Sequence, residues 1–381
     1  MISFCASASR SGAERPAASP VQGCNLATGA VVRIVAGMTG LVNFAKEPYS
    51  VQLRELLVPG IGEEDVLLAV QAVGVCGSDI HMYAGTPSWH VKYPVVLGHE
   101  FSGVIAKVGA RVRSFKEGDR VASETAAVLP PDSVYLRRGL YNLEPKRLGF
   151  GGEVDGAMAQ FVKVPERCLH RLPGSLSFEK AALTEPCCVA YNAVCVNSHI
   201  GAGDSVAVIG PGPIGLLCAI MARLSGAGHL VVIGVAADAG RLKIARQIGA
   251  QTTLGAHNED VADWVRNFRD GYGFDLVVDA AGVSASLKLA LDIVRPAGQI
   301  TKVGWGPQPF SASLDPLVKK AVTLQGSFSH NWPVWEMVIS LIASGKIDLD
   351  PILSRLAPLD GWRDIFDAMH SGEIVKGVLK P

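Results

Sequence analysis

The side chains best suited to chemistry in this chain are one cysteine, one histidine and two glutamates. Cys76 lies in VCGSDIH, His99 and Glu100 lie in LGHE, and Glu185 precedes a proline in LTEPCC. Thiolate, imidazole and carboxylate are ligands that zinc prefers, and a catalytic zinc keeps three protein ligands and one open position. The combination predicts a catalytic zinc site, with Cys76, His99, Glu100 and Glu185 as its candidate ligands.

A glycine-rich turn predicts a second site, which would bind a dinucleotide. VAVIGPGPIGLL places three glycines in a GxGxxG pattern between an expected strand and an expected helix. In that context the first glycine permits a tight turn, the second lets the backbone approach a pyrophosphate, and the third lets helix and strand pack closely. The candidate cofactor-binding residues are Gly210, Gly212, Pro213, Ile214, Gly215, Asp238, Arg241 and Gly304.

The residues after the next expected strand leave the choice of nicotinamide cofactor open. An acid about 20 residues after the glycines would bind the ribose hydroxyls of NAD. The strand HLVVIGV has no acid at its end, but Asp238 follows a few residues later and Arg241 comes after it. Asp238 could bind the ribose, whereas Arg241 could bind the 2′-phosphate of NADP. We favour NAD and keep NADP as the alternative.

Two sequence patterns along the chain predict the secondary structure that positions these sites. The first third has short valine-rich runs bounded by glycine, which are typical of a β-rich domain. From residue 205 strands alternate with helices, which predicts βαβ units and a parallel, doubly wound sheet in an α/β fold. The expected organisation is a leader over 1–37, a catalytic domain over 38–190 completed by 332–381, and a dinucleotide-binding domain over 191–331.

The composition excludes several classes of partner. Lys and Arg number 35, as do Asp and Glu, so the chain has no net charge to attract nucleic acid or an anionic membrane. The longest apolar run is broken by glycine and proline and is not a membrane span. Eight cysteines without a CxxC pair favour a reducing compartment, and we expect the cytoplasm. For 1–37 we favour a disordered extension or a misassigned start over a targeting peptide.

Taken together, the motifs resemble one enzyme family over residues 38–381. GVCGSDIHMYAGT, YPVVLGHEFSGVIAKVG, FKEGDRVA, VDGAMAQFV and VIGPGPIG occur in the order found in zinc-dependent medium-chain dehydrogenases, closest to the sorbitol (polyol) and threonine dehydrogenase branch. The resemblance implies a GroES-like β-rich catalytic domain joined to a Rossmann doubly wound parallel sheet. It also implies a homo-oligomer, either a dimer or a tetramer, and a small polyol or sugar-like substrate.

The same resemblance implies roles for the metal ligands. Cys76 and His99 would bind a catalytic zinc, and Glu100 and Glu185 would share the remaining protein position. Asp79 would fix the orientation of His99. Zinc would then act as a Lewis acid on the substrate hydroxyl, while the nicotinamide would accept a hydride.

Proton transfer is implied for two further residues. Ser78 would take the proton of the substrate hydroxyl, and His81 would carry it to solvent by way of the nicotinamide ribose. With Glu185 they are the candidate catalytic residues.

The stretch SVYLRRGLYNLEPKR departs from the family pattern. In this family a structural zinc is held by four cysteines, and the matching positions here are Pro130, Ser133, Leu136 and Glu144. None is a cysteine, so we expect one catalytic zinc and no structural zinc. The basic side chains of this stretch, Arg147 included, are expected to be solvated or to face another subunit. This stretch would form the small lobe that carries the structural zinc in the family. The apolar side chains expected to stabilise it here by burial are Val134, Leu136, Leu140 and Leu143.

A second departure concerns the substrate. Polyol dehydrogenases place an Arg–Tyr pair before an NxWP-like motif, and this chain has Ser329 and His330 there. His330 and Trp89 are candidates for the pocket wall, and sorbitol itself is in doubt. The predicted function is oxidation of a secondary alcohol of a polyol or sugar-like substrate with hydride transfer to NAD(P). The alternatives are a threonine-type hydroxy-amino-acid dehydrogenase and a non-catalytic NAD(P)-binding relative.

Overall fold

The computed structural model describes residues 23–25, 31–33, 37–256 and 261–381. Within these ranges no helix is long and apolar enough to cross a membrane. Of the expected leader, only β1 (Gly23–Asn25) and β2 (Val31–Arg33) are described, and they pair antiparallel. The remainder of the leader, on which the expectation of disorder depends, lies outside the described residues.

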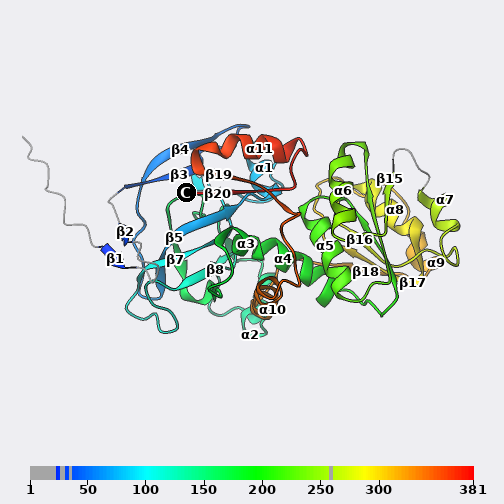
Figure 1. The fold of residues 1–381 in the computed structure, drawn as a ribbon, viewed down its shortest axis with the longest axis horizontal. Helices are drawn as coiled ribbons and strands as arrows, with labels where there is room; N and C mark the ends of the chain where they lie inside the picture. The colour runs from blue at the N-terminus through cyan, green and yellow to red at the C-terminus, as the bar shows by residue number, and fades with distance from the viewer. Residues whose placement is uncertain (1–22, 26–30, 34–36, 257–260) are drawn as a thin grey trace, which may run out of the picture.

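A β-rich lobe occupies the left half of Figure 1. Its main sheet has the order β12-β8-β7-β5-β20-β19, with β11 also paired to β5. A smaller sheet, β4-β3-β6, lies beside it. The strands are β3 (Gly37–Asn43), β4 (Val51–Leu57), β5 (Asp65–Gly74), β6 (Val95–Val96), β7 (Glu100–Val108), β8 (Arg120–Ser123), β11 (Phe161–Pro165), β12 (Leu169–Arg171), β19 (Leu353–Pro358) and β20 (Lys376–Lys380). The last two come from the end of the chain, which therefore returns to this lobe.

The central strand β5 is apolar on both faces because each face is covered. Val66, Leu68 and Val70 contribute to one buried cluster of the lobe. Leu67 and Ala69, which alternate with them, contribute to another. This alternation is the two-residue period of a strand. Burial on both faces fixes the position of β5, and with it the position of the residues that follow its last residue, Gly74.

The second lobe is a six-stranded sheet in which every pairing is parallel, in the order β15-β14-β13-β16-β17-β18. Its strands are β13 (Ser205–Ile209), β14 (His229–Gly234), β15 (Thr252–Gly255), β16 (Phe274–Asp279), β17 (Val294–Lys302) and β18 (Thr323–Gly326). Its helices are α5 (Pro213–Leu224), α6 (Ala239–Gln247), α7 (Val261–Arg266), α8 (Ser284–Ile293) and α9 (Asp315–Lys319). The strand order reverses at β13, which marks the ligand-binding edge of such sheets. The predicted α/β fold is confirmed.

Two helices connect the lobes and share one core. α4 (Thr184–Tyr191), followed by a π-helical turn at Asn192–Val196, and α10 (Trp332–Ala343) lie near the centre of Figure 1. A single buried cluster includes Leu183, Leu216 of α5, Trp335 of α10 and Val378 of β20. The other helices of the first lobe are α1 (Gly77–Tyr83), α2 (Val134–Arg137), α3 (Phe178–Ala182) and α11 (Trp362–His370).

Candidate metal centre and cofactor site

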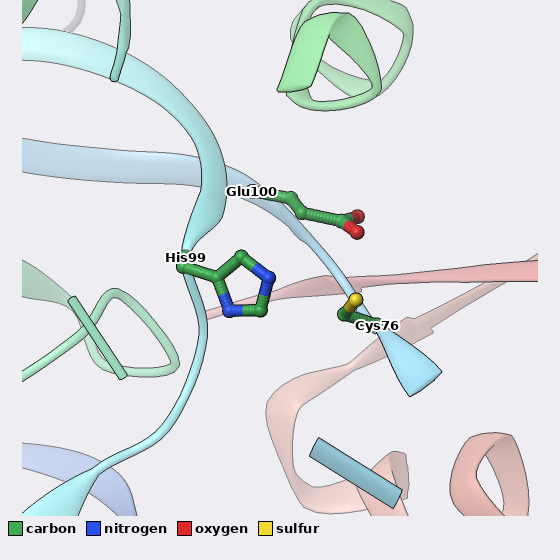
Figure 2. Close-up of side chains that lie close together, drawn as sticks. All are labelled: Cys76, His99 and Glu100. Carbon is green, nitrogen blue, oxygen red and sulfur yellow. The ribbon is translucent and has the colours of Figure 1, made fainter. Parts of the chain in front are cut away.

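Three of the four predicted metal ligands lie together. The ligand atoms of Cys76, His99 and Glu100 are all within 4.8 Å of one another. Figure 2 shows the three side chains converging, Cys76 from the end of β5 and the other two from the start of β7. The strands pair with Gly74 opposite Glu100. A Cβ at Gly74 would overlap Oε2 of Glu100, so glycine lets the carboxylate lie against the strand.

The Glu100 carboxylate already has a cationic partner. Nζ of Lys376 donates to Oε1 and lies 2.6 Å from Oε2, and both residues are buried. Burial raises the pKa of Glu100, whereas Lys376 acts in the opposite direction. Removing two charges from water is costly, and close pairing compensates much of that cost. Lys376 is a site residue that the sequence analysis missed, although a lysine within the apolar strand IVKGVLK was a visible signal.

Glu185, the fourth predicted ligand, is held by a histidine. Its Oε1 lies 2.9 Å from Nε2 of His330, and Nδ1 of His330 lies 2.7 Å from the indole nitrogen of Trp335. Since the indole N–H can only donate, Nδ1 accepts and the imidazole proton lies on Nε2. Burial opposes ionisation of Glu185, but the His330 hydrogen bond and nearby cations hold its pKa below the usual value. His330 therefore orients Glu185, where we had expected a residue of the pocket wall.

The electrostatics of the cluster favour a cation. Burial lowers the pKa of His99, but Cys76, Asp79 and Glu185 together hold it well above the usual value. Asp79 is fully buried, and its Oδ2 accepts a hydrogen bond of 2.8 Å from the Cys76 amide. Its Oδ1 and the Ser78 hydroxyl are buried and make no hydrogen bond to a described residue. The donor set and these two free polar atoms fit a zinc ion and a hydroxyl-bearing substrate.

The two predicted proton-transfer residues lie on α1. Ser78 and His81 are three positions apart, so their side chains share one helix face. Ser78 is half-buried, whereas His81 is exposed, with Nδ1 3.3 Å from Oγ1 of Thr86. This face of α1 therefore carries a buried hydroxyl at one position and an exposed imidazole three residues later.

The glycine turn has room for a phosphate group. Gly210 has a φ of +93°, which favours glycine, and a Cβ at Gly215 would overlap the carbonyl oxygen of Gly210. A Cβ at Gly212 would meet no protein atom within 4 Å, so the backbone there is open to a ligand. Pro213 and Ile214 begin α5, whose N-terminus attracts negative charge. These features fit a dinucleotide.

The residues that could choose between NAD and NADP are engaged with each other. Oδ2 of Asp238 accepts from the Val235 amide at 3.0 Å, and Oδ1 lies 3.6 Å from Arg241. Arg241 also donates to the carbonyl oxygens of Met369 and Ile374, at 3.4 and 3.5 Å. Its guanidinium therefore contacts the other lobe. A Cβ at Gly304, the last candidate, would lie 2.5 Å from the Gly282 amide, so that turn packs closely.

Comparison with known proteins agrees with this arrangement. Residues 62–174 match the alcohol dehydrogenase GroES-like domain, and residues 213–344 match the zinc-binding dehydrogenase family. The D-arabitol-phosphate dehydrogenase of Enterococcus avium is 36% identical over 86% of this chain and 92% of its own length. The sorbitol dehydrogenase of Halalkalibacterium halodurans is 36% identical over 86% and 95%.

The chain belongs to the zinc-dependent medium-chain dehydrogenase family. It is an NAD(P)-dependent dehydrogenase, as the resemblance implied. A solved zinc-binding dehydrogenase from Sinorhizobium meliloti, bound to NADP, superimposes with a TM-score of 0.83 at 26% identity, over 91% of this chain and all of its own. The predicted GroES-like domain and Rossmann sheet are confirmed.

In this dehydrogenase the segment 130–147, a small surface lobe that lacks the four cysteines, is stabilised differently from our prediction. Apolar burial was expected, but Val134 and Leu143 are 54% and 43% exposed, and no residue of α2 is buried. Ser133 and Glu144, two of the four matched positions, are instead hydrogen-bonded to each other. Ser133 also accepts from two amides at the start of α2, and Glu144 accepts from the Lys146 amide at 2.9 Å. A polar cross-link therefore joins two of the positions at which the resemblance implied zinc-binding cysteines.

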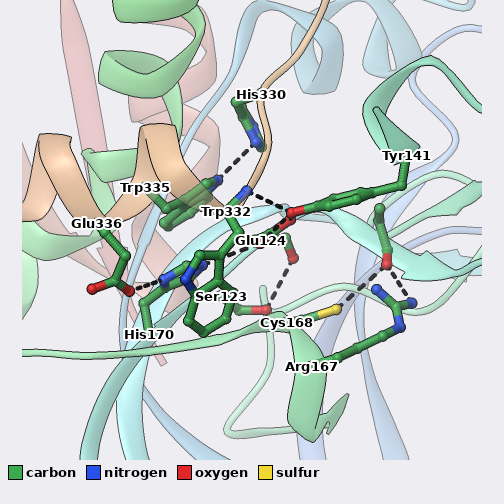
Figure 3. Close-up of polar contacts among 11 residues, drawn as sticks. Ser123, Glu124, Tyr141, Arg167, Cys168, His170, His330, Trp332, Trp335 and Glu336 are labelled. Carbon is green, nitrogen blue, oxygen red and sulfur yellow. Dashed lines mark hydrogen bonds and ion pairs between the residues drawn. The ribbon is translucent and has the colours of Figure 1, made fainter. Parts of the chain in front are cut away.

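A buried polar network ties this lobe to α10 (Figure 3). The Tyr141 hydroxyl donates to the Glu124 carboxylate at 2.8 Å and accepts from the Trp332 amide at 2.6 Å. His170 lies between two carboxylates, with Nε2 3.2 Å from Glu124 and Nδ1 2.6 Å from Glu336. The network was invisible in the sequence because its members come from four distant segments.

Replacing Tyr141 with phenylalanine should destabilise the lobe. The change leaves the Glu124 carboxylate and the Trp332 amide each without one partner, and we expect a loss of about 2 kcal/mol in the free energy of unfolding. Urea unfolding followed by tryptophan fluorescence measures it. Tyr135→Phe, in the same lobe, is the control and should change stability by less than about 0.5 kcal/mol. Equal effects of the two changes would contradict the role of the network.

Proposed function

We propose that this dehydrogenase oxidises a secondary alcohol of a polyol or sugar-like substrate to the ketone, with NAD as the hydride acceptor. The observation that carries the proposal is the convergence of Cys76, His99 and Glu100. The names of its relatives, D-arabitol-phosphate dehydrogenase and sorbitol dehydrogenase, support the substrate class. The finer assignments below extend this proposal.

In the proposed mechanism the chain's residues hold and orient the reactants. When bound, zinc supplies a Lewis acid that lowers the pKa of the substrate hydroxyl, and the nicotinamide supplies the hydride acceptor. Cys76, His99 and Glu100 hold the metal. Glu185, turned and kept ionised by the His330 hydrogen bond, orients a hydroxyl or water beside it. In this proposal the two glutamates therefore have separate roles.

The substrate proton leaves through α1 in this proposal. The Ser78 hydroxyl, buried and without a described partner, accepts a proton and passes one on. His81, exposed on the same helix face, delivers it to solvent. Asp79 contributes charge near His99 and fixes the Cys76 backbone through its 2.8 Å hydrogen bond.

The contacts that Arg241 already makes favour NAD over NADP as the cofactor. A 2′-phosphate requires a free cation, and Arg241 is already occupied by Asp238 and two carbonyl oxygens. Asp238, just after β14, is engaged by Arg241 and the Val235 amide, but each carboxylate oxygen has a further lone pair that can accept from a ribose hydroxyl. Comparison of kcat/KM for the two cofactors measures the preference, and a higher value for NADP would contradict it.

We expect one zinc per chain. The lobe positions that match the family's structural site carry Pro130, Ser133, Leu136 and Glu144, which offer no thiolate. Elemental analysis of purified, dialysed enzyme should find one zinc per polypeptide, removed by a chelator together with the activity. Two equivalents would show that a second site exists, and the account of the lobe would be wrong.

The experiment that tests the function is a substrate panel. Polyols, sugars and threonine are offered with NAD and with NADP, and the absorbance of reduced nicotinamide is followed before and after chelation. We expect turnover of polyols that zinc restores to the chelated enzyme. Turnover of threonine alone would favour the hydroxy-amino-acid alternative, and binding of cofactor without turnover would favour a non-catalytic relative.

A further inference from the structure

Four aromatic rings form a row that runs from α1 to the residues after β18. The ring centroids of His81 and Trp89 are 6.4 Å apart, those of Trp89 and Trp305 6.3 Å, and those of Trp305 and Phe328 5.7 Å. Trp305 and Phe328 also line a cleft of about 360 Å³ next to β17 and β18. Such a surface suits the C–H faces of a carbon chain, since pockets for small molecules combine apolar walls with a few polar groups.

A half-buried arginine lies at the Phe328 end of this row. The guanidinium carbon of Arg147 is 4.9 Å from the ring centroid of Phe328, in cation–π geometry. Within the described residues its side chain makes no hydrogen bond and no ion pair. Burial lowers the pKa of Arg147, which means that the surroundings disfavour its charge. The expectation of a fully solvated Arg147 is therefore wrong in part, because its side chain is half-buried, while contact with another subunit stays a prediction.

The two carboxylates near Arg147 form their hydrogen bonds with other groups and make no ion pair with it. Glu153 and Glu185 both act on its charge, but Glu153 accepts from the Gly149 amide at 2.8 Å and Glu185 from His330 at 2.9 Å. Lys302, which lines the cleft, is paired with Asp279 at 3.1 Å. Arg147, which lies beside the cleft against Phe328, is thus a cation that forms no ion pair with a described residue. A partly desolvated charge without a partner is costly, so a ligand anion would stabilise it.

We propose that Arg147 is a substrate-binding residue that accepts an oxyanion, a phosphate monoester or a carboxylate, carried by the polyol away from the oxidised carbon. The inference rests on the proposed function and narrows its substrate class. The planar guanidinium offers parallel N–H donors that match two oxygens of such a group. Arg147 also supplies a cation from the lobe, in a chain whose expected arginine position carries Ser329.

The test compares three substrates that differ at one end. D-arabitol, D-arabitol phosphate and D-arabinonate are assayed with wild type, Arg147→Gln, Arg147→Lys and the control Lys146→Gln, whose exposed side chain acts on the charge of Glu144 but forms no hydrogen bond or ion pair with a described residue. We expect wild type to prefer one of the anionic substrates over D-arabitol. Arg147→Gln should reduce that preference about 10- to 100-fold, mainly through KM, because a hydrogen bond to a charged group is lost. Arg147→Lys should lie between, and Lys146→Gln should match wild type.

The outcomes separate this inference from the proposed function. Equal use of D-arabitol and both anions by wild type, or a preference that survives Arg147→Gln, overturns the inference and leaves polyol oxidation standing. An increase only in the KM for NAD would place Arg147 at the cofactor and also overturn it. The function could fail because no substrate is oxidised. In that case, D-arabitol phosphate that raises the unfolding temperature of wild type but not of Arg147→Gln would still support an anion site at Arg147. Unfolding temperatures of all variants show whether each folds.

Discussion

Replacing Cys76 with alanine is expected to abolish zinc binding and to lower kcat/KM for the alcohol about 1000-fold. The thiolate is one of three converging ligands, and its loss removes the Lewis acid, which contributes several kcal/mol to the transition state. Zinc content and steady-state rates of the variant measure the two effects together. Binding of the reduced cofactor, followed by its fluorescence, should persist because the glycine turn belongs to the other lobe.

The matched control is Cys195→Ser. Cys195 is half-buried, and its Sγ lies 3.4 Å from the Ser225 hydroxyl, a contact that serine can keep. This variant should retain one zinc and a wild-type rate. If Cys76→Ala keeps its zinc and its turnover, the cluster is not the metal centre.

Replacing Lys376 with methionine should destabilise the metal-free enzyme by about 3–5 kcal/mol. The change leaves the Glu100 carboxylate buried without its counter-charge, and broken buried ion pairs have effects of this size. With zinc bound, the loss should be smaller because the metal supplies positive charge beside Glu100. The free energy of unfolding, measured with zinc and with chelator, gives both values.

Lys380→Met is a control from the same strand. Lys380 pairs with Glu179 at 2.7 Å, but its side chain is 53% exposed, and exposed pairs contribute about 1 kcal/mol or less. Its effect should not depend on zinc. Two results would contradict the shared charge of Glu100. One is that Lys376→Met lowers the free energy of unfolding as little as Lys380→Met does. The other is that its effect is identical with and without metal.

The parts of the site that follow from local spacing could be predicted. The glycines at 210, 212 and 215 reveal their role because a tight turn, an open backbone and a close helix contact each constrain one position. Cys76 and His99 could be predicted as ligands from their residue types and from the motifs that resemble the family, and the structure places them two residues after β5 and directly before β7. The doubly wound sheet followed from alternating strands and helices.

What could not be predicted depends on contacts across the chain. Lys376 is 276 positions from Glu100, and His330 is 145 from Glu185, so no periodicity reveals either pair. The lobe was misjudged because its leucines were read as buried, whereas a small surface lobe leaves them half-exposed and uses the Ser133–Glu144 hydrogen bond instead. The half-buried position of Arg147 could not be predicted either, because only the fold places its guanidinium over the Phe328 ring.

Diffraction data collected on both sides of the zinc absorption edge test the central claim most directly. The account predicts one anomalous peak per chain, about 2.3 Å from Sγ of Cys76 and about 2.0 Å from the His99 imidazole, with Glu100 beside it and none between Ser133 and Glu144. A crystal of active, zinc-loaded enzyme without a peak at Cys76 and His99, or with the peak between Ser133 and Glu144, would contradict it.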